Sequence, residues 1–218
     1  MRGLASFVVF ALVALLAAAV VSAGNPTKEQ IERTAAGNAR AKSEVLRHAD
    51  VGSGWSGGFK KPDLSSTLHC DYHPKQSDLV LIGAAEADWR RQAFTIDSEA
   101  QVLRTPAMVR KDWRRSVLAP QVLPCLRQDF KHSLGSKAEL VSARRVAFPR
   151  LATYTRAFRF VAKVKTEIGQ VAVEFDFVAL GAGRNELSLA LGGPAVMRAF
   201  LHDKELHLAR VLARRAGS

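Results

Sequence analysis

Alternation of apolar and polar residues in the second half of the chain constrains the fold more than any other feature of the sequence. The pattern marks four expected strands, over residues 140–148, 154–165, 171–179 and 187–191. Two short glycine-containing segments, 168–170 and 181–183, supply turns between consecutive strands. Alternation with a period of two indicates one packed face and one solvent face, which is typical of antiparallel sheets. We therefore expect a series of hairpin strands here.

Helical patterns lie before and after these strands. Thr105 followed by Pro106 is typical of an N-cap with proline at the first helical position. A second helix is expected to end at Gly135, and a last one to follow Asp203. Helices grouped around hairpin strands, rather than alternating with single strands, favour the α+β class over α/β. The sequence predicts a single α+β domain with an antiparallel sheet packed against helices.

The first hundred residues predict a helix, a loop and further strands. Thr27 and Gln30 fit a capping box, so a helix is expected from there to about His48. Residues 50–62 form a glycine-rich loop that carries Trp55. Trp55 is expected either to fix this loop to the core or to lie at the edge of a ligand groove. Strand-like segments follow at residues 66–70, 79–85 and 92–97.

Residues 1–23 have the layout of a secretory signal peptide. Arg2 supplies the positive start, residues 4–21 are apolar except for one serine, and Ala23 offers a small residue at the cleavage position. We expect cleavage after Ala23; an uncleaved leader that anchors the domain to the membrane is the alternative. The expected division is a signal peptide over 1–23, an N-terminal helix over 24–48 and the main domain over 49–218.

The chain is strongly basic, with a formal net charge of +12. Loss of the leader removes one arginine and no acid, which leaves +11 on 195 of the 218 residues. Such a charge is compatible with an anionic partner, such as nucleic acid, an acidic polysaccharide or a membrane surface. The basic residues are scattered as singles and pairs, however, so no specific nucleic-acid partner is expected. An anionic polymer of the cell envelope stays open.

Cys70 and Cys125 are the two cysteines of the chain. An even number of cysteines in an exported protein favours a disulfide bond, and two cysteines allow one intramolecular pairing. Two buried thiols or a redox pair are the alternatives. We expect a structural disulfide between Cys70 and Cys125.

Few other residues suggest chemistry. Residues 69–73 carry two histidines and Cys70, but a strand or turn would separate the histidines too far for one metal ion. His202, Asp203 and His207 are expected as exposed residues at the start of the last helix. Glu174 and Asp176 are expected on an exposed strand face, paired with Arg or Lys, or binding calcium as the alternative. No catalytic residue, metal or cofactor is expected.

The order of landmarks resembles a family of exported bacterial domains. Gly54-Trp55 in an early loop, Cys70 at an early strand, Pro124-Cys125-Leu126 and a last helix over 205–214 are similar to the extracellular sensor domains of bacterial serine/threonine kinases and related lipoproteins. The resemblance covers residues 45–215 and implies a PsbP-like fold, in which helices pack against a curved antiparallel sheet. This chain lacks the second cysteine pair that those domains often carry.

The sequence therefore favours an exported, sensor-like or binding module without catalysis. Its partner is expected to be an unknown small ligand or protein, with Trp55 as the candidate ligand-binding residue. Two other functions stay open: a basic cell-envelope protein that binds an anionic polymer, and a small secreted hydrolase.

Overall fold

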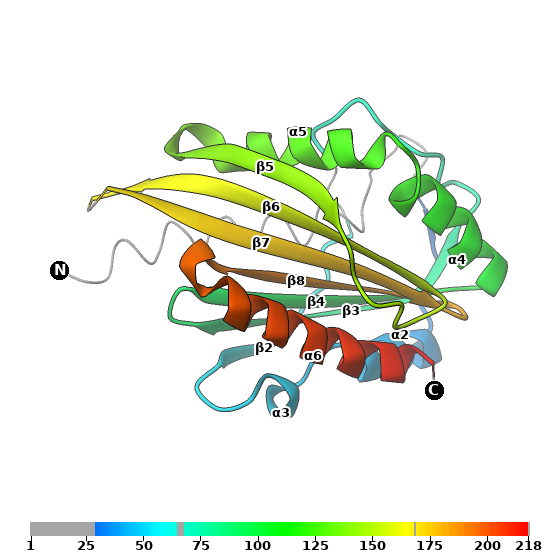
Figure 1. Ribbon diagram of the computed structural model, residues 1–218. Helices are drawn as coiled ribbons and strands as arrows, with labels where there is room; N and C mark the ends of the chain where they lie inside the picture. Colours follow the sequence, from blue (N-terminus) through cyan, green and yellow to red (C-terminus); the bar gives the residue numbers. More distant parts are fainter. Residues whose placement is uncertain (1–28, 65–67, 168, 218) are drawn as a thin grey trace.

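The computed structural model describes residues 29–64, 68–167 and 169–217 of the chain, so the predicted signal peptide lies outside the described residues. An open sheet runs in the order β1-β3-β4-β8-β7-β6-β5, and β2 pairs with one end of β3 (Figure 1). The strands are β1 (Gln30–Ile31), β2 (Ser56–Lys60), β3 (Val80–Arg91), β4 (Phe94–Leu103), β5 (Ala138–Val146), β6 (Tyr154–Thr166), β7 (Gly169–Ala182) and β8 (Asn185–Pro194).

The predicted α+β class is confirmed, with one difference in the sheet. All pairs are antiparallel except β1 with β3, so the sheet is mixed. The helices are α2 (Ala35–Glu44), α3 (His48–Val51), α4 (Pro106–Asp112), α5 (Val122–Leu134) and α6 (Arg198–Ala216). Among the described residues, no helix is long and apolar enough to cross a membrane.

Helices cover both faces of the sheet (Figure 1). On one face, α2 and α6 pack on a core that includes Ile96, Leu189 and Leu212. On the other face, α5 and the π-helical turn η1 (Trp113–Val117) pack on the phenylalanines of β6 and β7. There, the Phe130 ring stacks on Phe160 with centroids 4.9 Å apart. Each of these apolar layers follows the period of two in the strands.

The predicted disulfide is confirmed. Cys70 and Cys125 are bonded, and both are buried beside Leu68. The bond joins the loop before β3 to α5, across 55 positions of sequence. Disulfides form and persist in oxidising compartments, so this bond is consistent with an extracytoplasmic protein.

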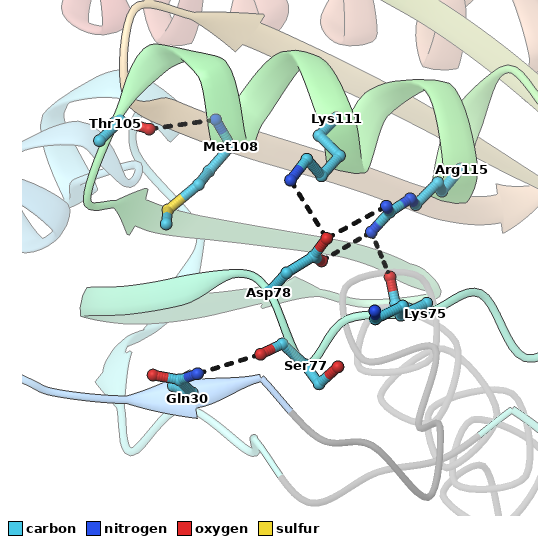
Figure 2. Close-up of polar contacts among 8 residues, drawn as sticks. All are labelled: Gln30, Lys75, Ser77, Asp78, Thr105, Met108, Lys111 and Arg115. Carbon is cyan, nitrogen blue, oxygen red and sulfur yellow. Dashed lines mark hydrogen bonds and ion pairs between the residues drawn. The ribbon is translucent and has the colours of Figure 1, made fainter.

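An ion-pair cluster holds the same loop against α4 and η1 (Figure 2). The Asp78 carboxylate accepts from both Arg115 Nη atoms, at 2.7 and 3.2 Å, and from Lys111 Nζ at 3.1 Å. Arg115 also donates to the Lys75 carbonyl at 2.6 Å. The hydrogen bonds from Arg115 are the main reason that the pKa of Asp78 lies well below its usual range.

Helix ends agree with the sequence patterns in the middle of the chain. The Thr105 side chain accepts from Met108 N at 3.2 Å, and Pro106 is the first residue of α4. Gly135 has a φ of 58° where α5 ends, a conformation that glycine adopts at little cost.

Other boundaries differ from the expectations. Gln30 and Ile31 pair with β3 in the region expected to be helical, and α2 begins after its N-cap Thr34. No strand forms over residues 68–70, where the disulfide and loop contacts determine the backbone. β3 continues to Arg91 and includes Trp89, because the β3–β4 pairing extends to the turn that follows it. α6 begins at Arg198, five residues before Asp203.

Candidate ligand-binding site

Trp55, the residue predicted to bind a ligand, lies in the core, in an apolar cluster to which α2, α3 and α6 also contribute residues. It is 5% exposed and belongs to the apolar cluster that includes Val51 and Trp89. It therefore packs its loop against the body of the protein, and it lines neither of the two cavities described below. Its role in ligand binding stays a prediction.

The histidine-rich segment around Cys70 forms part of the disulfide region. His69 Nδ1 lies 3.2 Å from Asp129 Oδ1, and its ring stacks on His132 with centroids 3.9 Å apart. Asp129 also accepts from His69 N at 2.8 Å. These contacts tie the segment to α5 next to the Cys70–Cys125 bond.

A cavity of about 390 Å³, here called the Glu205 cavity, lies between the start of α6 and the edge of the sheet formed by β5 and β6. This volume is typical of sites for small ligands. Its lining is Val146, Ala147, Phe148, Arg159, Arg198, Ala199, His202 and Glu205. One wall is thus apolar, whereas the β6 and α6 sides carry ionisable groups.

Ion pairs fix the sheet side of this cavity. Arg159 of β6 is the cross-strand partner of Asp176 of β7, and its Nε and Nη2 donate to the Asp176 carboxylate at 2.6 and 2.7 Å. Glu174 Oε1 lies 3.2 Å from Arg159 Nε, and Glu174 Oε2 accepts from Arg198 Nε at 2.7 Å. This network joins β6, β7 and the first turn of α6.

The prediction that Glu174 and Asp176 pair with basic residues is correct, but the predicted exposure is wrong. Their exposed fractions are 0% and 2%. The strand alternation does place both on the face opposite the phenylalanines, and α6 covers that face. Because α6 starts earlier than expected, its first turns shield these carboxylates from solvent.

Glu205 is the unusual member of the cavity lining. Its side chain is 1% exposed, and neither carboxyl oxygen has a hydrogen-bond partner among the described residues. Burial is the largest cause that raises its pKa, to about 8; Asp176 and Glu174 raise it further, while Arg159 lowers it. Glu205 therefore keeps its proton at neutral pH and can donate a hydrogen bond.

His202 is an ionisable neighbour of Glu205, three residues before it on α6. Its Nδ1 lies 3.5 Å from Glu205 Oε2, and its side chain is 49% exposed. The expectation that His202 is exposed is correct, and its side chain also lines the Glu205 cavity.

Sequence reasoning did not identify this site, although a signal for it exists. Arg198, His202 and Glu205 stand at i, i+4 and i+7, which places them along one face of a helix. The last helix was expected to follow Asp203, with His202 at its start, so Arg198 lay outside it and the spacing was not recognised. The distant contributions of Phe148 and Arg159 have no local signature.

A second polar region lies on the opposite face of the sheet. Carboxylate oxygens of Glu86, Asp97 and Glu99 lie within 4.8 Å of one another and are buried, an arrangement that can hold a metal ion. Lys60 Nζ already contacts this group, 2.6 Å from Glu86 and 3.2 Å from Asp97. Burial raises the pKa of Asp97 to about 7, against the lowering effect of Lys60.

A smaller cavity lies nearby, beside Asp112 and Glu186. Its volume is about 40 Å³, which has room for ordered water but not for a ligand of several atoms. The two carboxyls are within hydrogen-bonding reach of each other, and burial raises the pKa of both. Ser116 donates to Asp112 at 2.6 Å. This region is a buried polar layer between the sheet and η1.

Comparison with known proteins adds little. No protein-family model and no curated protein match the chain. The crystal structure of LpqN, involved in cell envelope biogenesis of Mycobacterium tuberculosis, aligns with 78% of this chain and 86% of LpqN. The TM-score is 0.31 and the sequence identity is 13%. A likeness at this level carries no argument about function or ligand, and it does not test the resemblance to kinase sensor domains.

Proposed function

We propose that the protein is an exported, non-catalytic binding module that holds a small amphipathic ligand in the Glu205 cavity. The observation that carries the proposal is the Glu205 carboxyl, which is buried at the cavity with neither oxygen hydrogen-bonded. A buried polar group without a partner costs about 1–3 kcal/mol. A ligand that accepts from this carboxyl recovers that energy.

Export rests on two observations of different kinds. The predicted leader over 1–23 directs the chain out of the cytoplasm. The Cys70–Cys125 disulfide fits the oxidising compartment that the leader implies. The finer assignment, a sensor-like domain of the kind found in bacterial kinases, rests on the sequence resemblance alone.

The two sides of the cavity indicate the chemistry of the ligand. Val146, Phe148 and Ala199 suit an apolar body. At the other side, the protonated Glu205 carboxyl can donate a hydrogen bond. Arg198 can donate as well, because Glu174 accepts only from its Nε and a guanidinium has five N–H donors. Donors of this kind suit an anionic head, so the proposed ligand is a carboxylate or similar anion on an apolar body.

Dodecanoate binding, measured by displacement of the fluorescent anion 8-anilino-1-naphthalenesulfonate, tests this proposal. Ala199→Trp places a large side chain at the cavity and is expected to weaken binding by about ten-fold or more. His207→Trp is the matched control, because His207 is exposed on the same helix and does not line the cavity. Equal binding by Ala199→Trp and wild type would place the ligand elsewhere.

The protonation of Glu205 gives a second readout. An anionic head pairs with the neutral carboxyl and is repelled by the carboxylate, so dodecanoate affinity is expected to fall as pH rises through about 8. Glu205→Gln keeps the shape and removes the titration, and is expected to bind with a flatter pH dependence. A wild-type affinity that rises between pH 7 and pH 9 contradicts the proposed role of Glu205.

A small hydrolase is the second candidate function, and one observation favours it. A carboxyl with a pKa near 8, beside His202 in a cavity, is suited to general acid–base catalysis at neutral pH. Hydrolysis of p-nitrophenyl esters by the purified protein, abolished in Glu205→Gln, would establish this function in place of simple binding. Turnover equal in wild type and Glu205→Gln would exclude Glu205 as its catalytic residue.

A further inference from the structure

The start of α6 exposes a group of large apolar side chains. Val196, Met197 and Phe200 are 91%, 44% and 36% exposed, whereas the other exposed large apolar residues of the described chain are scattered over separate elements. The Phe200 ring packs edge-on against Phe94 of β4, with centroids 5.0 Å apart. Figure 1 shows this end of α6 beside the turn that joins β3 and β4. We call residues 90–94 and 195–200 together the tip.

Three arginines lie close to these apolar residues, and one of them, Arg90, also pairs with Asp88 at 3.3 Å. Arg90 and Arg91 are exposed at the end of β3, and the Arg198 side chain is 53% exposed. Arg91 also lies close to Lys204 of α6: after burial, its positive charge is the second cause that lowers the pKa of Lys204. Like charges that repel each other at a surface favour an anionic partner.

The distribution of charge through the whole protein points the same way. Nine of the 20 acidic residues are buried, whereas no lysine or arginine in the described part of the chain is. The surface is therefore richer in positive charge than the formal +12 suggests. A partner that approaches the tip meets apolar side chains within a basic surround.

We propose that the tip docks on the surface of an anionic lipid bilayer. Val196, Met197 and Phe200 enter the boundary between headgroups and acyl chains, and the arginines contact lipid phosphates. Apolar insertion combined with basic contacts is the usual chemistry of a peripheral membrane site. The inference does not depend on the proposed ligand, although Arg198 and Ala199 also line the Glu205 cavity and would place it beside the membrane.

Co-sedimentation with vesicles tests the docking. The protein, as cells produce it, is mixed with vesicles of phosphatidylglycerol and phosphatidylcholine, or of phosphatidylcholine alone. Wild type is expected to bind the anionic vesicles, with an affinity that falls as salt rises. Val196→Asp removes an apolar contact and adds a repelled charge, so it should weaken this binding by about ten-fold.

Val141→Asp is the matched control. Val141 is 51% exposed on β5, so the same substitution there makes the same change of charge away from the tip. It is expected to leave binding within about two-fold of wild type. The two variants have the same N-terminus, so any binding through that segment is equal in both and the difference between them reports on the tip. Circular dichroism checks that both variants are folded.

Several outcomes would overturn the inference. The inference fails if wild type does not bind anionic vesicles at low salt. It also fails if Val196→Asp and Val141→Asp lose equal affinity for these vesicles. Soluble poly-L-glutamate is also added to the vesicle mixture. If it displaces wild type from the vesicles, and Val196→Asp binds the vesicles and the polymer as well as wild type does, the basic surface binds a soluble polymer instead. A dimer in gel filtration that Val196→Asp dissociates, without vesicle binding, would make the tip an interface between copies.

Discussion

Replacement of Glu205 by glutamine should change how the stability of the protein depends on pH. In the unfolded chain this carboxyl loses its proton near pH 4.5, whereas in the folded protein it keeps it to about pH 8. Because Glu205 holds its proton in the folded state between these values, its contribution to stability is largest below pH 4.5 and falls as pH rises toward 8. An ion-paired carboxylate has the opposite effect, because folding lowers its pKa and its contribution to stability is lost as pH falls.

The size of the effect follows from linkage. One proton held by the folded state alone lowers the free energy of unfolding by about 1.4 kcal/mol per pH unit. From pH 5 to pH 8, Glu205 thus contributes a loss of up to about 4 kcal/mol. Burial raises the pKa of Glu44 and Asp97 to about 7, so wild type should lose more than this in total. Glu205→Gln should remove only its own share.

Urea unfolding at pH 5, 6, 7 and 8, at constant ionic strength and with the disulfide intact, measures these slopes. Glu139→Gln is the control, because Glu139 is exposed on β5 and the charge change is the same. Its slope should equal that of wild type. A Glu205→Gln slope equal to wild type would refute the reasoning, because it would mean that Glu205 is ionised in the folded protein at neutral pH.

Three further predictions concern the core, the disulfide and the leader. Trp55→Ala is expected to lower the free energy of unfolding, measured with urea, by about 3–5 kcal/mol. A variant that stays as stable as wild type but no longer binds dodecanoate would instead show that Trp55 binds the ligand. Cys70→Ser with Cys125→Ser should cost about 4 kcal/mol, and two alkylatable thiols in unreduced wild type would contradict the bond. N-terminal sequencing of the secreted protein should begin at Gly24, and retention of Met1 in membranes would establish the anchor.

The sequence by itself determined the class of fold and the strands of the second half of the chain. The period of two in residues 154–191 predicted β6, β7 and β8, because alternation depends only on the pleat of each strand. Thr105 and Gly135 marked helix ends through their own backbone and side-chain preferences. The cysteine pair followed from counting, given an exported chain.

The tertiary structure alone decided which faces are covered. Glu174 and Asp176 alternate with apolar residues as exposed residues would, yet α6 buries them, and their charges are balanced by Arg159 and Arg198 from other elements. Glu205 has an ordinary place in a helical sequence, and its raised pKa arises from the surroundings that folding gives it. Burial and the approach of distant charges depend on how helices and sheet pack, and no local pattern of residues encodes them.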